Sequence, residues 1–179
     1  MTAPALRRYA EAVDAAHGEL TRLDQASGDG DFGDNLRAGL RRVLTELDAA
    51  PDAASGAAPD AAQGPAQGPA QGPAQGPAQG PAQGATEGAE AAGHGFDVAG
   101  RVFLDEVGGT SGPLFGLLFT ELARALDEDP RTGWARGAAA GLAAIQRVGE
   151  AEVGDRTLVD ALAPAVAALE GGAGLADAA

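Results

Sequence analysis

The chain has 179 residues, no cysteine, and 26 acidic against 12 basic residues, which gives a formal net charge of −14. This length fits one domain with a sizeable core, and the lack of cysteine excludes a disulfide framework and thiolate chemistry. The acidic balance argues against nucleic acid and anionic membrane surfaces as partners. We see no long apolar run at the N-terminus that would indicate a signal peptide or membrane span, so we expect a cytoplasmic protein.

Apolar residues recur at helical spacing along most of the chain, and no segment shows sustained period-two alternation. The first helix is expected to end at Gly18 and to be followed by a short helical turn from Glu19. These segments predict an all-α antiparallel bundle or barrel of about seven or eight helices, with Asp155 as the N-cap of the last predicted segment. We expect Trp134 in the core, and His17 and His94 exposed and without chemistry. The main helices are predicted over 3–17, 34–47, 96–107, 113–126, 132–148 and 156–169.

Residues 51 to about 95 differ in composition from the rest, because they are almost all Ala, Gly, Pro, Gln and a few acids. Five copies of Gln-Gly-Pro-Ala run from Gln63 to Ala82. Such a tract has no large apolar side chain to bury and cannot offset its ordering entropy. We therefore expect a disordered insertion within one domain spanning 1–179, with a docking tract as the alternative.

The segment from Asp24 to Asn35 carries four carboxylates separated by glycines. Mg²⁺ binds oxygen ligands, often one or two carboxylates together with substrate phosphates. Glycines allow the backbone to turn tightly enough to aim several side chains at one point. The segment predicts either a Mg²⁺ site for a phosphorylated ligand or an acidic turn that only caps the next helix.

A second glycine-rich segment, from Val107 to Gly116, places Thr110 and Ser111 before Pro113 at a plausible first helical position. Backbone N–H groups at a helix start attract anions, and the helix dipole favours negative charge there. The two hydroxyls could cap the helix, bind phosphate, or do both. Together, the two segments suggest one loop for a metal and another for phosphates.

The two segments resemble the nucleotide-binding L subunit of dihydroxyacetone kinase, the DhaL family. That family has an Asp, four residues, then Gly-Asp-Gly-Asp-His-Gly with an Asn soon after, and a Gly-Gly-Ala/Thr-Ser-Gly-Pro-Leu segment matched by 108–114. A third match, 149–162, resembles the family's Gly-Asp-Lys-Thr-Met-x-Asp segment, which lies near the adenine. The resemblance covers roughly 5–50 and 96–169, and implies a helical barrel whose inter-helix loops converge on the nucleotide.

The resemblance also implies site residues. Asp34 could instead cap the next helix, which its residue type favours, and Asn35 could be a helix-start residue. We expect no covalent nucleophile. Asp24, Asp29 and Asp31 are the expected metal ligands, and Phe32, Gly33, Asp34, Asn35, Gly109, Thr110, Ser111, Gly149 and Leu158 the expected nucleotide-binding residues.

The implied function is an ADP- or ATP-binding kinase subunit that uses Mg²⁺, two ions in the family. It would present a phosphate for transfer to a ketose held on a separate dihydroxyacetone-binding K subunit, with free ATP or a phosphotransferase-system protein as donor. One alternative is a non-catalytic, nucleotide-loaded regulatory or degenerate family member. The other is a structural helical domain whose acidic loop only caps a helix.

This sequence departs from the family at three places. Phe32 stands where the family has a histidine, and a phenyl ring cannot hydrogen-bond phosphate or base. Leu158 replaces the usual methionine, a mild apolar change. The family continues with a Gly-Arg-Ala-Ser and an Asp-Pro-Gly segment that contact the nucleotide, and 170–179 hold no counterpart of that arginine. Either the chain is truncated or it has lost part of the nucleotide lid, and we therefore expect lower activity than in other family members.

Overall fold

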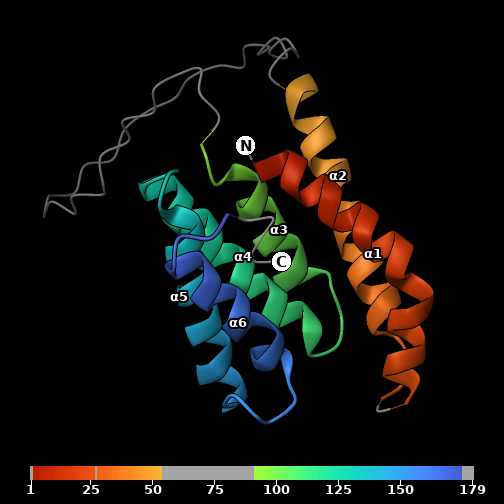
Figure 1. Ribbon diagram of the computed structural model, residues 1–179. Helices are drawn as coiled ribbons and strands as arrows, with labels where there is room; N and C mark the ends of the chain where they lie inside the picture. The colour runs from red at the N-terminus through yellow and green to blue at the C-terminus, as the bar shows by residue number, and fades with distance from the viewer. Residues whose placement is uncertain (1, 27, 54–90, 175–179) are drawn as a thin grey trace, which may run out of the picture.

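The computed structural model describes residues 2–26, 28–53 and 91–174, and every regular element in these ranges is a helix (Figure 1). The predicted all-α bundle is therefore confirmed. The helices are α1 (Thr2–Gln25), α2 (Phe32–Ala53), α3 (His94–Asp105), α4 (Ser111–Glu128), α5 (Gly133–Gly149) and α6 (Leu158–Glu170).

The first helix is longer than predicted. Gly18 does not end it, because α1 continues without a break to Gln25. A glycine inside a helix costs about 1 kcal/mol relative to alanine. That cost is tolerated here because the apolar stripe of α1 continues past Gly18 to Leu20, which packs against the core. The two predicted segments on either side of Gly18 thus form one helix, and the described residues contain six helices where about seven or eight were expected.

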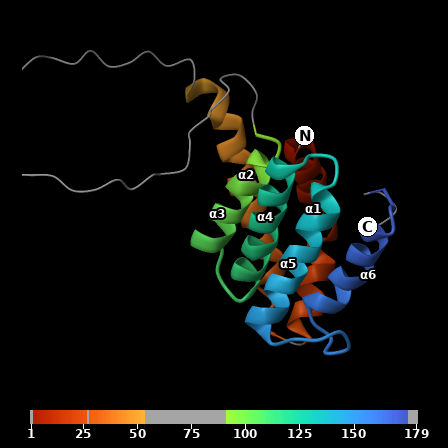
Figure 2. The ribbon, with the colours of Figure 1, turned by 90° about the vertical axis from the view of Figure 1, so that its left-hand side faces the viewer.

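Successive helices pack against one another in chain order, from α1 to α2, α2 to α3, and on to α6. The turns that join α1 to α2, α3 to α4, and α5 to α6 lie at the same end of the bundle, the lower end in Figures 1 and 2. Among the described helices, α6 contacts only α5, so the ring of helices implied by the family resemblance stays open between α6 and α1.

The core is centred on aromatic side chains of α3 and α4. Phe103 is fully buried and lies edge-on to Phe119, with ring centroids 5.2 Å apart. Trp134 meets Phe96 edge-on at 5.4 Å and is partly buried, so it packs at the margin of the core. These contacts fix α3 and α4, and hence the turn between them, relative to α5.

Several boundaries differ from prediction. Helix α2 begins at Phe32, two residues early, α4 begins at Ser111 rather than Pro113, and α3 begins at His94. Asp155 is not the N-cap of α6: Thr157 is, and it forms a capping box with Asp160.

The Gln-Gly-Pro-Ala repeat lies outside the described residues, so its expected disorder stays a prediction. Within the described ranges, no helix has the length and apolar content needed to cross a bilayer.

Candidate metal and phosphate site

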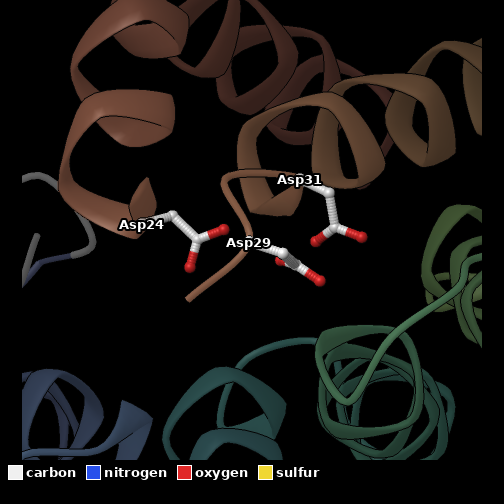
Figure 3. Close-up of side chains that lie close together, drawn as sticks. All are labelled: Asp24, Asp29 and Asp31. Atoms are coloured by element: carbon white, nitrogen blue, oxygen red, sulfur yellow. The ribbon is translucent and has the colours of Figure 1, made fainter. Parts of the chain in front are cut away.

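Asp24, Asp29 and Asp31 come together at the turn between α1 and α2 (Figure 3). One carboxylate oxygen from each lies within 4.8 Å of the other two. Asp24 is partly buried at the end of α1, whereas Asp29 and Asp31 are exposed. Three convergent carboxylate oxygens, open to solvent on one side, match the oxygen ligands and remaining water or phosphate positions that Mg²⁺ requires. These residues therefore fit a magnesium site.

Asp24 has a second contact that holds its side chain in place. Its Oδ2 accepts a hydrogen bond of 3.0 Å from the backbone N–H of Phe32, the first residue of α2. The carboxylate thus satisfies one of the free N–H groups at the start of that helix. Its other oxygen, Oδ1, is not used by this bond. Asp24 therefore links α1 to α2 while keeping one oxygen for a cation.

Two glycines shape the acidic turn. Gly30 has φ of +85°, a left-handed conformation that disfavours other residues, and it lies between Asp29 and Asp31. A Cβ on Gly28 would lie 2.9 Å from Asp24 Oδ1, so a side chain there would displace the carboxylate. Glycine at these two positions therefore allows the three aspartate side chains to lie where they do.

The second glycine-rich segment lies directly opposite this turn. A cavity of about 380 Å³ separates the two, and both segments line it. Thr110 is the N-cap residue of α4 but its hydroxyl makes no capping hydrogen bond, so the capping alternative does not account for this side chain. The cavity lining consists of Asp24, Gly28, Asp29, Asp31, Phe32, Gly109, Thr110 and Ser111.

Three helices start at this end of the bundle. The chain alternates in direction, so α2, α4 and α6 all begin beside the turns at the lower end of Figure 1. Each start carries free backbone N–H groups and the positive end of a helix dipole. The end that carries the acidic turn is therefore also the end at which helix dipoles favour an anion.

Among the other predicted nucleotide-binding residues, Asn35 lies next to the cavity. It lines a smaller neighbouring cavity of about 160 Å³ together with Gly108. Gly33 and Asp34 line neither cavity. Gly33 is buried against α1, where a Cβ would lie 2.9 Å from Thr21 Oγ1. Asp34 contacts His17, with its Oδ1 2.8 Å from His17 Nε2.

These contacts correct three predictions. Asp34 lies inside the first turn of α2 and does not cap it, because the helix begins two residues earlier. His17 is only 26% exposed at its side chain, since it pairs with Asp34 between α1 and α2. His94 is half-buried at the start of α3 rather than freely exposed.

Gly149 and Leu158 lie at the α5–α6 turn and do not line the cavity. Gly149 is the last residue of α5, and Leu158 is the first of α6 and packs against the core. Phe32 does line the cavity, and its ring faces Phe115 at a centroid distance of 6.3 Å. The apolar ring thus joins the cavity wall to the core.

Sequence reasoning missed two residues beside the acids. Gly28 was not singled out, although a side chain at this position would displace the Asp24 carboxylate. Thr21 was also missed, and its Oγ1 is the buried side-chain polar atom without a partner among the described residues. The only sequence signal was local: Gly28 lies inside the acidic run, and Thr21 lies one helical turn before Asp24.

Residues 80–179 match the DAK2 domain, a range that covers more than half of the chain. The chain therefore belongs to the DAK2-domain family. This agrees with the all-helical fold and with the motifs that suggested a DhaL-type protein.

Individual relatives point the same way. The chain is 28% identical over 169 residues to the ADP-binding subunit DhaL of PEP-dependent dihydroxyacetone kinase 1 from Listeria innocua, over 92% of this chain and 65% of that protein. It is 31% identical to D-erythrulose kinase from Mycolicibacterium smegmatis, over 95% of this chain and 24% of that protein. It is 40% identical over 62 residues to human triokinase/FMN cyclase, over 34% of this chain and 11% of that protein. The chain thus spans less than two thirds of each.

Proposed function

We propose that this chain is the nucleotide-binding subunit of a kinase of the dihydroxyacetone kinase type. It binds ADP or ATP with Mg²⁺, two ions by analogy with the family, and presents the terminal phosphate to a ketose. The observation that carries this proposal is the shared cavity, because an acidic turn and a hydroxyl-rich helix start face each other across it. Membership of the DAK2-domain family and the names of the relatives support the same function.

In this proposal, Asp24, Asp29 and Asp31 hold the metal on the α1–α2 side of the cavity. Bound magnesium supplies charge neutralisation for the phosphates, which phosphoryl transfer requires. Across the cavity, the hydroxyls of Thr110 and Ser111 and the N–H groups at the start of α4 bind phosphate oxygens. The hydrogen bond from Phe32 N–H holds the Asp24 carboxylate in place on the α1–α2 side. The nucleotide is therefore oriented by two separate elements.

The described residues that line the cavity offer carboxylates, hydroxyls, glycines and one phenyl ring, none of which is suited to hold a ketose covalently, so we infer that the acceptor is held elsewhere. We propose a separate K subunit that carries the ketose, as the family resemblance implies; the Listeria relatives are named as the ADP-binding subunit of a kinase, which supports a kinase of more than one subunit. Names that specify PEP or phosphotransferase-system dependence suggest a phosphotransferase protein as an alternative donor to free ATP. A cytoplasmic location stays an expectation from the sequence.

The test is calorimetric titration of the full chain with ADP, in Mg²⁺ and again in EDTA. Binding should depend on Mg²⁺, and Asp29→Asn should abolish it while Glu11→Gln, which changes an exposed acid near the middle of α1 outside the cavity lining, should not change it. Ketose phosphorylation should then appear only when a K subunit is added. Wild-type affinity in Asp29→Asn would refute the metal assignment. Tight Mg-ADP binding without turnover beside any cognate K subunit would favour the non-catalytic alternative.

A further inference from the structure

One face of α2 connects the acidic turn to the second glycine-rich segment. Asp31 directly precedes α2 (Figure 3), and its backbone carbonyl accepts a 2.9 Å hydrogen bond from Asn35 N–H, so this acid is fixed to the helix. Asn35, Gly39 and Arg42 follow at helical spacing and line the cavity of about 160 Å³ between α2 and the end of α3. Asn35 Nδ2 lies 3.7 Å from the position of a Cβ on Gly109. This face of α2 therefore reaches from the metal side of the main cavity to the opposite side.

Gly39 makes the closest contact on this face. A Cβ at this position would lie 2.6 Å from Val107 Cγ2 and 2.9 Å from Phe103 Cζ. Carbon atoms in contact normally lie about 3.5–4 Å apart. The ring of Phe103 is fully buried and packs against the rings of Phe115 and Phe119, so it has no room to turn away. A side chain at position 39 must therefore move α2 and the end of α3 apart by roughly 0.5–1 Å.

The start of α4 rests on the same two residues. A Cβ on Gly112 would lie 2.2 Å from the backbone oxygen of Val107 and 3.0 Å from that of Phe103, so the first turn of α4 touches this backbone directly. Ser111 precedes Gly112 and lines the metal cavity. Because a close-packed interior transmits displacements, a shift of residues 103 and 107 passes to Ser111. Gly39 thus controls the separation between the acidic turn and the start of α4.

This separation decides which cation fits the cavity. In the proposed function, on which this inference rests, a cation lies between the acids on one side and phosphate oxygens on the other. Bonds from oxygen to Mg²⁺ are about 2.1 Å long, and those to Ca²⁺ about 2.3–2.6 Å. Two such bonds in series differ by about 0.5–1 Å, which is the shift that a Cβ at position 39 would cause. We infer that Gly39 is a positioning residue, which keeps the cavity narrow and thereby makes it selective for Mg²⁺ over Ca²⁺.

The test compares the affinity for ADP in Mg²⁺ and in Ca²⁺ by calorimetric titration. Gly39→Ala should weaken Mg-ADP binding tenfold or more and Ca-ADP binding much less, so the ratio of the two affinities should fall at least fivefold. Gly141→Ala is the matched control, because a Cβ there would also lie 2.6 Å from a side-chain carbon, Leu118 Cδ1, and neither residue lines the cavity. It should lower the Tm and leave the ratio unchanged. Gly39→Ala/Val107→Ala removes the closest clashing atom, so its ratio should lie between those of the unaltered chain and Gly39→Ala.

An unchanged ratio in Gly39→Ala would overturn the inference. An equal fall in Gly141→Ala would also overturn it, since loss of packing anywhere in the bundle would then change the ratio. If Gly39→Ala does not fold, the double variant decides: it keeps the 2.9 Å contact with Phe103 Cζ, so its ratio should still fall, and an unchanged ratio would overturn the inference. A failure of the unaltered chain to bind ADP in either cation would refute the proposed function itself, whereas tight Mg-ADP binding without any effect of Gly39→Ala would refute this inference alone.

Discussion

Asp24 and Asp29 should respond differently to substitution, although both are proposed metal ligands. Asp24 accepts a 3.0 Å hydrogen bond from the start of α2, whereas the carboxylate of Asp29 makes no hydrogen bond to the described residues. Replacing a side chain that caps a helix start by alanine costs about 1 kcal/mol. Asp24→Ala should therefore lower the Tm of the metal-free chain by roughly 3 °C, given the usual scaling for a domain of this size.

Asp29→Asn should instead leave the metal-free chain as stable as before, or more so. The three carboxylate oxygens lie within 4.8 Å of one another, and removing one charge relieves repulsion of up to about 1 kcal/mol per pair near water. Asp24→Asn should resemble Asp29→Asn in stability, because an amide oxygen can still accept the bond from Phe32 N–H.

The assay is thermal unfolding in EDTA and then in saturating Mg-ADP. At a free ligand concentration a hundredfold above Kd, binding adds about 2.7 kcal/mol of stability to the unaltered chain. All three variants should lose this gain, while Glu11→Gln should keep it. If Asp29→Asn destabilised the metal-free chain as much as Asp24→Ala does, the acidic turn would be a structural cap rather than a metal site. If Asp29→Asn kept the Mg-ADP gain, the proposed ligand set would be wrong.

Three further predictions concern the turn, the core and the insertion. Gly28→Ala should weaken Mg-ADP binding roughly tenfold with little change in metal-free stability, because its Cβ would lie 2.9 Å from Asp24 Oδ1; calorimetry giving unchanged affinity would contradict this. Burial raises the pKa of Tyr9, the only tyrosine, to about 12. The folded chain keeps this proton where the unfolded chain loses it, so stability is intact below pH 10 and falls by about 2 kcal/mol between pH 10 and 12; urea unfolding of Tyr9→Phe should show that much less decline. Deleting Gln63–Ala82 should change Tm and ADP affinity little, because the repeat has no large apolar side chain and loop closure depends weakly on length; a large loss of stability would show that the repeat is packed.

The helices were predictable because apolar residues recur at helical spacing along each of them. The residues at which the helices begin and end were less predictable. Gly18 is a reasonable stop signal in isolation, but the continued packing of Leu20 outweighs its cost. At the start of α6, both Asp155 and Thr157 are residue types that commonly cap a helix. Thr157 is the N-cap, because Asp160 lies three residues after it and completes a capping box. The capping box could have been predicted from that spacing. Whether α1 ends at Gly18 could not, because the answer depends on tertiary contacts.

The site was predictable as two segments but not as a detailed arrangement. The acid spacing and the glycine-rich helix start indicated a metal loop and a phosphate loop, and the structure brings them to one cavity. The bond from Phe32 N–H to Asp24 crosses from one helix to the next, so no local pattern reveals it. The same holds for the contact of Asp34 with His17, which joins α1 to α2.

The charges at the site end of the bundle explain why metal and nucleotide should bind together. Three carboxylates repel an anionic nucleotide, while the starts of α2, α4 and α6 attract it. The dipoles act within about one turn of each helix start, so they partly offset the acids without neutralising them. A divalent cation bound by the acidic turn changes this balance, because it attracts the nucleotide phosphates that the carboxylates alone would repel. In the proposed function, the acids would therefore make nucleotide binding conditional on metal, and by linkage the nucleotide would strengthen metal binding by the same factor.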